Sequence, residues 1–515
     1  MNIDSDAAIT PRAARTFPQL IRATAATYGD SLAITLNGDT IPDDAMSFRE
    51  LDTRSAELAR GLLARGVGKG SRVGFISGNG PFFALMFAAI GRIGAVAVPI
   101  STLIKQNELV RVLRQSDVSG LIVQRNFLGN DYVERLCEAL PDLREGTSAD
   151  LRIARTPYLR WIVAAGGDLP ATILGMDHLT GAAASVSEEL LREAEAEVHT
   201  TDQLIEIYTS GSMALPKGVK HNHGPAIFRA HFMHEISGIQ RGKEYNCVLP
   251  MFWVGGLMMS LLPNWEAGAT TVCTERTMSN STMAMGSVLP DEDLKAMSNQ
   301  PRPWWGLGMS ETLGPYSYGD EFRAAGYPVC APMDHWADRY EVRIADENHC
   351  QVGDGELGEL QIRGYPVTTG LHKIERDEHF TPDGYYRTGD VCLVDGTRVH
   401  FIGRGGDMIK TASSNVSPAE VEMEMQALEG IHSAYVVGLP DQERGELVVA
   451  AVVPRDGVTL DFAAIEAELK RRMSSYKVPR AYVEIAREEV PMLHSNKVSK
   501  RLVAKLLAER LGRAS

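Results

Sequence analysis

The sequence predicts an α/β fold with a large N-terminal domain and a small α/β C-terminal domain. Two observations lead to this prediction. Strand-like and helix-like segments alternate early in the chain, which is typical of a parallel sheet with helices on its faces. The pattern then changes near the Gly-rich stretch "GRGGDMIK" at 403–410. We therefore expect one domain over 1–403 and a second over 404–515, with the glycines as a hinge.

The first elements follow from the spacing of apolar residues. "FRELDTRSAELARGLLARG" predicts a helix that stops at Gly66, with one apolar face made of Leu51, Ala56, Ala59, Leu62 and Leu63. "SRVGFIS" predicts a buried strand, 82–93 a helix and "AVAVPI" a second strand. The run "PFFALMFAAIGRIGAVAVPI" contains Arg92 and two glycines, so we expect a buried helix and strand there and no transmembrane segment.

The C-terminal region has its own pattern. "SPAE" at 417–420 combines a Ser cap, Pro at the first helical position and Glu three residues after the cap. Val421, Met425 and Leu428 then share one helical face, and Gly430 is expected to end the helix. Short strands are predicted at 433–437, 447–453 and 481–485, around a second helix near 462–473. These elements are enough for a small domain with its own core.

Composition excludes several classes of protein. The chain has 515 residues, 44% of them hydrophobic, which suits a multidomain globular protein. A net charge of −14 argues against nucleic acid as a partner, although the segment from Lys470 to Arg513 has 12 Lys/Arg against 4 Asp/Glu. The six cysteines form no CxxC pair and the N-terminus has no signal-peptide pattern, so we expect a cytoplasmic location.

The stretch "YTSGSMALPKG" at 208–218 offers the chemistry of an anion site. Counted from Gly211, it has Pro and Gly where a Walker loop needs its second Gly and its Ser or Thr, so that motif is absent. The stretch still provides hydroxyls, closely spaced amides and a cation, from Thr209, Ser210, Gly211, Ser212 and Lys217. Such groups bind phosphate oxygens. A solvated turn between a strand and a helix is the alternative.

Four further motifs follow in order: "GLGMSE" (306–311), "GYYRTGD" (384–390), "GRGGDMIKTASSNVSPAEVE" (403–422) and "HSNKVSK" (494–500). Together with 208–218 they resemble the adenylate-forming (AMP-binding) superfamily, in its acyl-CoA synthetase branch. The resemblance covers residues 47–505, nearly the whole chain. It implies a large domain of stacked mixed sheets and helices, and a mobile C-terminal domain.

The resemblance assigns the 208–218 stretch to the β- and γ-phosphates of ATP. The family pattern there is Y-T-S-G-S-T-G-x-P-K-G. Met213 replaces a hydroxyl residue and Ala214 replaces a glycine, so one phosphate contact and some backbone freedom are expected to be lost.

In "GLGMSE" the resemblance assigns Ser310 to the α-phosphate and Glu311 to Mg²⁺, with Gly308 in the nucleotide site. A single carboxylate is enough because Mg²⁺ keeps waters and phosphate oxygens as its other ligands. Leu307 stands where an aromatic residue often packs on adenine. A Ser–Glu pair that caps a helix is the alternative reading of this motif.

Three more residues are carried over from the family. Asp390 of "YRTGD" matches the aspartate that binds the ribose hydroxyls, and Arg404 matches an arginine that reaches the nucleotide. Lys497 matches the catalytic lysine of the S-G-K motif, with Asn496 in place of the glycine. A simple turn at 388–390 and a solvated surface lysine are the corresponding alternatives.

The stretch "PMFWVGGLMMSLL" at 250–262 is similar to the family's segment at the acid and thiol tunnel. The resemblance places Trp253 at its aromatic gate, next to Gly255 and Gly256. Glycines, methionines and tryptophan suit an apolar acid. A buried strand-to-helix core is the alternative for any one of these residues.

These inferences predict an AMP-forming acid–thiol ligase of fatty acid or lipid metabolism. It would use ATP, Mg²⁺ and coenzyme A to convert an apolar carboxylic acid, fatty or related, to acyl-AMP and then to the CoA thioester. The alternatives are an acyl-AMP ligase that serves a carrier protein, and a non-catalytic relative that binds nucleotide or acyl-CoA. We expect no nucleic acid partner and no transmembrane segment, and the sequence leaves a homodimer open.

Other readings have less support. "GMSET" ends in Thr, so the G-x-S-x-G elbow of serine hydrolases is absent. Four histidines at 221–234 lack HExxH spacing, which argues against a zinc site. The segment 274–305 is shorter than its family counterpart, and we find no Gly-Gly-Ala-Pro type segment there to line the adenine site.

Overall fold

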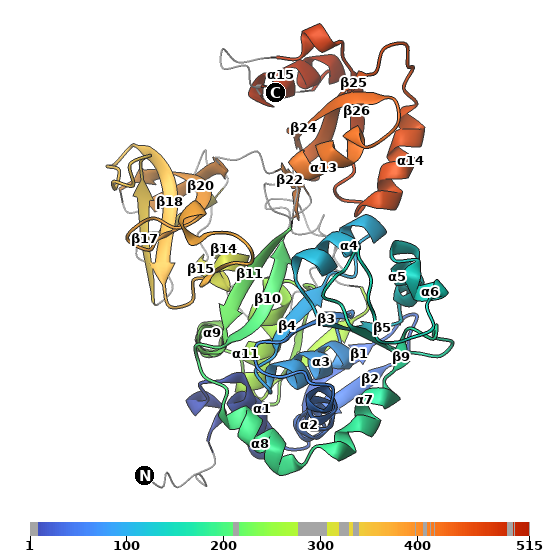
Figure 1. The fold of residues 1–515 in the computed structure, drawn as a ribbon. Helices are drawn as coiled ribbons and strands as arrows, with labels where there is room; N and C mark the ends of the chain where they lie inside the picture. The colour runs from blue at the N-terminus through green and yellow to red at the C-terminus, as the bar shows by residue number, and fades with distance from the viewer. Residues whose placement is uncertain are drawn as a thin grey trace.

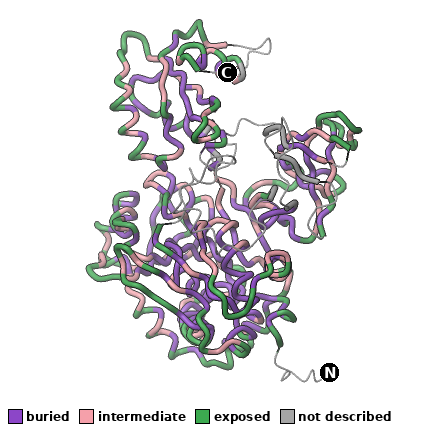
Figure 2. Tube along the Cα trace, turned by 180° about the vertical axis from the view of Figure 1, so that it is seen from behind, coloured by how far each residue is buried: buried purple, intermediate pink, exposed green. Residues whose placement is uncertain are grey.

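The computed structural model describes residues 9–209, 216–276, 306–318, 329–332, 339–396, 398–404, 409–411, 414–416, 418–491, 498 and 500–513. Within them the predicted α/β fold is confirmed: large N-terminal sheets carry helices, and a separate C-terminal domain follows (Figure 1). Figure 2 shows buried residues through the middle of each body and exposed residues around its rim. The boundary at 403/404 stays a prediction.

An eight-stranded sheet forms the centre of the large domain. Its order is β19-β11-β10-β4-β3-β5-β8-β9. The strands are β3 (Arg72–Ile76), β4 (Val96–Ile100), β5 (Gly120–Gln124), β8 (Trp161–Ala165), β9 (Leu174–Gly175), β10 (Gln203–Thr209), β11 (Lys217–Asn222) and β19 (Gly370–Leu371). The two strands predicted from "SRVGFIS" and "AVAVPI" are β3 and β4, and they pair in parallel as expected. Only β11 reverses direction, against β10 on one side and β19 on the other.

Helices cover this sheet. They are α1 (Phe17–Tyr28), α2 (Phe48–Ala64), α3 (Pro81–Gly91), α4 (Gln106–Gln115), α5 (Tyr132–Ala139), α6 (Asp142–Glu145), α7 (Asp177–Ala182), α8 (Glu188–Ala196) and α9 (His223–Ser237). Ser47 and Glu50 form a capping box that starts α2, the predicted helix. α3 is buried on almost every side, which agrees with the prediction of a core helix. No helix among the described residues is long and apolar enough to cross a bilayer.

A second sheet of the large domain joins segments that are far apart in the chain. Its order is β12-β13-β1-β2, with β1 (Leu32–Asn37), β2 (Asp44–Ser47), β12 (Glu244–Asn246) and β13 (Thr270–Thr274). Ile34 of β1 pairs with Thr271 of β13 in parallel register. Just beyond β13, the Glu275 carboxylate accepts hydrogen bonds from the amides of Asp39, Thr40 and Ile41, at 2.5, 2.5 and 2.8 Å. The N-terminal strand is therefore held by residues from the middle of the sequence.

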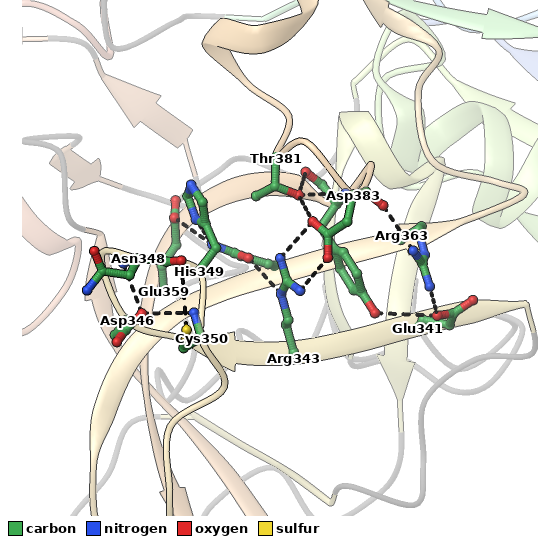
Figure 3. Close-up of polar contacts among 12 residues, drawn as sticks. Glu341, Arg343, Asp346, Asn348, His349, Cys350, Glu359, Arg363, Thr381 and Asp383 are labelled. Atoms are coloured by element: carbon green, nitrogen blue, oxygen red, sulfur yellow. Dashed lines mark hydrogen bonds and ion pairs between the residues drawn. The ribbon is translucent and has the colours of Figure 1, made fainter.

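A five-stranded antiparallel sheet has the order β16-β21-β20-β18-β17. Its strands are β16 (Val329–Pro332), β17 (Tyr340–Ala345), β18 (Leu357–Gly364), β20 (Tyr386–Asp395) and β21 (Arg398–Arg404), and the short hairpin of β14 (Gly306–Met309) and β15 (Gly314–Tyr318) forms its own pair. Figure 3 shows charged side chains on this sheet, where Arg343 donates to Asp383 at 2.6 Å and Arg363 pairs with Glu341. Because the carboxylates are exposed, these pairs contribute little to stability.

The C-terminal domain has its own sheet and core. It contains β22 (Ile409–Thr411), β23 (Ser414–Val416), β24 (Ile431–Asp441), β25 (Gly445–Pro454) and β26 (Ala481–Glu484), with α13 (Pro418–Gln426), α14 (Phe462–Arg472) and α15 (Lys500–Leu511). Val421, Met425 and Leu428 are buried in its core, as predicted. The expected helix end at Gly430 is wrong, because α13 ends at Gln426. After Gln426 the Leu428 amide donates to the Met425 carbonyl, three residues back, instead of continuing the α-helical pattern. This tighter turn places Leu428 in the core.

The two domains meet through buried charges. Lys477 of the C-terminal domain donates to Glu108 of α4 at 2.6 Å and to Glu420 of α13 at 2.9 Å. The Ser474 hydroxyl, with its single proton, lies within donating distance of two acceptors, the Leu103 carbonyl at 2.9 Å and Glu108 at 3.1 Å. Burial alone would lower the pKa of Lys477, but Tyr476, Glu108 and Glu420 outweigh it and raise that pKa. We call Glu108, Glu420 and Lys477 the interdomain triad.

Candidate active site

The predicted phosphate stretch lies at the tip of an antiparallel hairpin. β10 and β11 pair so that Thr209 faces Lys217 and Tyr208 faces Gly218. The loop between them, with Ser210, Gly211 and Ser212, lies outside the described residues. The hairpin therefore brings the hydroxyl residue at one end of the loop opposite the cation at its other end.

A buried carboxylate supports the base of this hairpin. Glu206 of β10 accepts hydrogen bonds from the Tyr208 hydroxyl at 2.6 Å and from the guanidinium of Arg72 at 3.3 Å. Burial, followed by the charge of Glu206, raises the pKa of Tyr208, so the phenol keeps its proton and donates it. A Cβ on Gly218 would lie 2.7 Å from a Glu206 carboxylate oxygen and 2.8 Å from the Tyr208 hydroxyl. A larger residue at 218 would therefore displace the Glu206 carboxylate or the Tyr208 ring.

The hairpin is joined to the "GLGMSE" segment by His221. This histidine lies on β11, and its Nε2 is 2.6 Å from the carbonyl oxygen of Ser310. Burial lowers the pKa of His221 to about 4, so the ring is neutral at pH 7 and Nε2–H is assigned as the donor. Ser310 begins a short 3₁₀ turn, Ser310–Thr312, between β14 and β15. The phosphate hairpin and the Ser310–Glu311 pair are thus fixed relative to each other.

Glu311 is held from two further sides. The Tyr386 hydroxyl donates to its Oε1 at 2.9 Å, and its backbone carbonyl accepts from the Thr368 amide at 2.7 Å. The Thr368 hydroxyl in turn donates to the Lys220 carbonyl of β11 at 2.7 Å. These bonds tie the segment that carries Glu311 to the strand that carries Lys217.

The pKa of His379 responds to the charges of both Lys217 and Glu311. Burial lowers the pKa of His379, and the charge of Lys217 lowers it further, while Glu378 and Glu311 oppose the shift. Both Lys217 and Glu311 are therefore close enough to act on one imidazole. A cation on β11 and a carboxylate on the turn bonded to β11 both act on this imidazole, and a metal–triphosphate requires charges of these two signs.

A buried arginine fixes the turn after Glu311. Arg229 of α9 donates to the carbonyl oxygens of Leu313 and Pro315, at 3.4 and 2.6 Å. Its guanidinium also lies over the ring of Phe232, 4.9 Å from the centroid. On the facing strand, a Cβ on Gly308 would come within 2.7 Å of the Gly314 backbone, so this motif glycine is required by close packing.

Asp390 lies on the same strand as Tyr386, and both are on its buried face. The register of β20 against β18 shifts between Arg387 and Val391, so the strand is irregular between these two residues. Across the sheet, Asp390 pairs in register with Arg404 of β21. β20 and β21 therefore bring the predicted ribose aspartate beside the predicted nucleotide arginine, and Lys497 lies outside the described residues.

The predicted acyl segment, 250–262, contains Trp253 as the N-cap of α10 (Val254–Gly256). It continues through a π-helical turn, Leu257–Leu261, into α11 (Leu262–Ala267). Such π-turns are frequent at functional sites. The side chain of Asn79 fixes the residues just before Trp253, since it accepts a hydrogen bond from the Met251 amide at 2.7 Å and donates one to the Leu249 carbonyl at 2.8 Å. Met258 lies beside the hairpin turn at Gly314, so the segment reaches the Ser310–Glu311 turn.

The two glycines of this segment are expected to respond differently to alanine. A Cβ on Gly256 would lie 2.3 Å from the Pro250 carbonyl oxygen, which is backbone, whereas a Cβ on Gly255 would meet only the tip of Leu249 at 2.7 Å. We expect Gly256→Ala to destabilise the protein by about 1–3 kcal/mol, as overpacking usually does, and Gly255→Ala to cost less than half of that. Thermal unfolding of the two variants checks this, and equal midpoints would contradict it.

The histidines at 221–234 all have structural partners. His223 Nδ1 accepts from the Phe17 amide at 3.2 Å, and burial lowers the pKa of His223 to about 3. His231 and His234 both contact Glu266. In the part of the chain that the structure describes, no group of three or more His, Cys, Asp and Glu residues could hold a metal ion.

Comparison with known proteins agrees with this arrangement. Residues 21–285 match the family model described as AMP-binding enzyme, and residues 420–497 match that of the AMP-binding enzyme C-terminal domain. The chain belongs to the AMP-binding enzyme family. Its curated relatives are acid–CoA ligases and synthetases, so the predicted enzyme class, an AMP-forming acid–CoA ligase, is confirmed for the family.

Three relatives illustrate the range. This AMP-binding enzyme is 26% identical to the putative acyl-CoA synthetase YngI of Bacillus subtilis, over 94% of this chain and 96% of that protein. It is 27% identical to feruloyl-CoA synthase of an Amycolatopsis species (88% and 93%), and 25% identical to the mitochondrial medium-chain acyl-CoA ligase ACSF2 of Mus musculus (94% and 86%). At such identities the acid is not determined.

Solved structures share the fold of this AMP-binding enzyme. The o-succinylbenzoate CoA synthetase of Bacillus subtilis superimposes with a TM-score of 0.70 at 18% identity, covering 94% of this chain and 98% of that one. The amide bond synthetase McbA of Marinactinospora thermotolerans gives 0.71 at 20% identity, with 95% and 99% covered. The predicted fold class is thereby confirmed.

Proposed function

We propose that this enzyme activates an apolar carboxylic acid with ATP and transfers the acyl group to coenzyme A. One observation carries the proposal. The hairpin with Thr209 and Lys217 at the ends of its loop is bonded through His221 to the turn that carries Ser310 and Glu311. These are the groups needed to hold a triphosphate while one carboxylate oxygen approaches the α-phosphorus.

In the first step, a carboxylate oxygen of the acid attacks the α-phosphorus of ATP. The bond from that phosphorus to the bridging oxygen breaks, and pyrophosphate leaves with its electron pair. Lys217 and the loop stabilise the charge that develops on the leaving group, and Ser310 orients the α-phosphate. Mg²⁺, held by Glu311 and phosphate oxygens, would neutralise charge on the triphosphate.

In the second step, the thiol sulfur of coenzyme A attacks the acyl carbonyl carbon. The bond to the AMP oxygen breaks and AMP leaves, with one proton released from the thiol. We propose that Lys497 serves the first step only, and that the C-terminal domain, from 404 onward, turns about the hinge between the two steps. Asp390 and Arg404 would hold the AMP moiety through both steps.

An apolar acid is supported by the segment after Trp253. Its neighbours Phe252, Leu257 and Met258 are buried with apolar side chains around them. The names of the relatives point the same way, since they include a medium-chain acyl-CoA ligase, a feruloyl-CoA synthase and an indoleacetate–CoA ligase. We therefore place the acid among fatty or aryl acids with a large apolar part.

Pyrophosphate release over a panel of acids tests the proposal. The panel contains hexanoate, octanoate, ferulate and indoleacetate, with acetate and malonate as small and polar controls. Release with one apolar acid that becomes catalytic only with coenzyme A supports the synthetase. Turnover with a phosphopantetheinylated carrier protein instead of coenzyme A would favour the acyl-AMP ligase, and absence of release with any acid would favour the non-catalytic relative.

Two further predictions concern the state of the enzyme in the cell. A cytoplasmic location stays a prediction, because the curated relatives include mitochondrial ligases. A homodimer also stays a prediction, and light scattering of the purified chain would measure its mass directly.

A further inference from the structure

Tyr386 makes a contact that the motif comparison did not assign. Tyr386 lies on β20, and its hydroxyl donates to Oε1 of Glu311 at 2.9 Å. The bond therefore connects β20 to the 310–312 turn that carries the carboxylate. The carboxylate group of a glutamate rotates about its Cγ–Cδ bond unless a hydrogen bond fixes one of its two oxygens. Second-layer hydrogen bonds of this kind orient ligands and change metal affinity.

The ring of Tyr386 is itself held in place. It is almost fully buried, the imidazole of His379 stacks against it with centroids 6.2 Å apart and planes at 23°, and Phe380 meets it edge-on at 5.2 Å. Phe380 and Tyr386 also form a backbone bridge. The direction of the hydroxyl is therefore fixed by packing on two sides, and its hydrogen bond fixes one oxygen of Glu311.

We infer that Tyr386 is a positioning residue: its hydroxyl orients the Glu311 carboxylate to receive the divalent cation of the ATP complex. The inference rests on the proposed function, since it takes Glu311 as the cation ligand. It predicts that loss of the hydroxyl lowers metal affinity more than nucleotide affinity measured without metal, because its hydrogen bond holds an oxygen of Glu311, the proposed cation ligand.

Tyr386→Phe tests this, because the ring and its packing remain while the hydroxyl is removed. Tyr385→Phe is the matched control, since the adjacent hydroxyl is 3.4 Å from the exposed carboxylate of Glu341, in the surface network of Figure 3. We would titrate Mn²⁺ into each full-length protein with a non-hydrolysable ATP analogue and follow free Mn²⁺ by electron paramagnetic resonance. Tyr386→Phe is expected to weaken Mn²⁺ binding about 10-fold, and Tyr385→Phe is expected to match wild type.

A double variant separates positioning from general loosening of the site. If Tyr386 acts through Glu311, then Glu311→Gln with Tyr386→Phe should bind Mn²⁺ no more weakly than Glu311→Gln alone. Additive losses, or equal losses in the Tyr385 and Tyr386 variants, would overturn the inference, as would wild-type affinity in Tyr386→Phe. Thermal unfolding confirms that each variant is folded. If wild type binds no metal–nucleotide complex and Glu311→Gln changes nothing, the proposed function itself fails.

Discussion

Lys217→Met is expected to lower kcat/KM for ATP in acyl-AMP formation by about 10²–10³-fold, the usual cost of removing one group that stabilises transition-state charge. The lysine begins β11 opposite Thr209, and its charge reaches the imidazole beside Glu311. Methionine keeps the length of the side chain and removes the cation. The loss should appear in pyrophosphate release, while transfer from supplied acyl-AMP to coenzyme A is spared because pyrophosphate has already left.

Lys220→Met is the control for this variant. Lys220 lies three residues along the same strand, so its side chain leaves the opposite face. It is close to Gly370 of β19, at the edge of the sheet. We expect wild-type kinetics from Lys220→Met, and equal losses in the two variants would remove Lys217 from its proposed role in phosphate binding.

Lys477→Met is expected to undock the C-terminal domain. It removes the cation that the buried carboxylates of Glu108 and Glu420 share, and removing one partner of a buried ionic group costs about 3–5 kcal/mol. Small-angle scattering should then show a larger radius of gyration. The ratio of the two half-reaction rates should also change, because in the proposed cycle each domain arrangement serves one half-reaction. Lys470→Met is the control, since Lys470 pairs on the surface of α14 with Glu466.

A rescue experiment identifies the cause. Adding Glu108→Gln and Glu420→Gln to Lys477→Met removes the two carboxylate charges that faced the lysine, and replacement of a whole buried ionic group is often close to neutral. We expect the triple variant to regain most of the docked population. If scattering is unchanged in Lys477→Met, or if the triple variant is as expanded as the single one, the interdomain triad does not hold the docked state.

The elements that could be predicted from the sequence are those with a local signal, such as a capping box, or a continuous apolar pattern. β3 and β4 are buried on both faces, so they appear in the sequence as unbroken apolar runs. α2 has a capping box at its start and an apolar stripe along its length. The end of α13 was misplaced because the stop at Gly430 is visible in the sequence, whereas the tightening at Leu428 depends on the core that this residue enters.

The candidate site was predictable only as far as linear motifs reach. The motifs identify Lys217, Glu311 and Asp390, but Arg229 belongs to none of them. Its partners are backbone carbonyls 84 and 86 residues away, which a linear motif does not reveal. The sequence suggests only a metal-ligand role for His221, whereas its imidazole binds the Ser310 carbonyl and joins the phosphate hairpin to the "GLGMSE" motif. Tyr386 stands inside a quoted motif, yet its partner became visible only when β20 was placed beside the 310–312 turn. Most of the shortened 274–305 segment, residues 277–305, lies outside the described residues, so its effect on the adenine site stays a prediction.

The parallel pairing of β1 with β13 has a consequence for biosynthesis. β1 leaves the ribosome long before β13 is made, and at 5–20 residues per second the delay between Ile34 and Thr271 is roughly 12–50 s. During that time only β2 can pair with β1, and a two-stranded hairpin is marginal in water. The nascent chain therefore presents Ala33, Ile34 and Leu36, all buried in the finished protein, to chaperones or to neighbouring chains until residue 274 has emerged. Synthesis that stops before β13 would leave an aggregation-prone fragment, whereas release after β13 allows the N-terminal sheet to close.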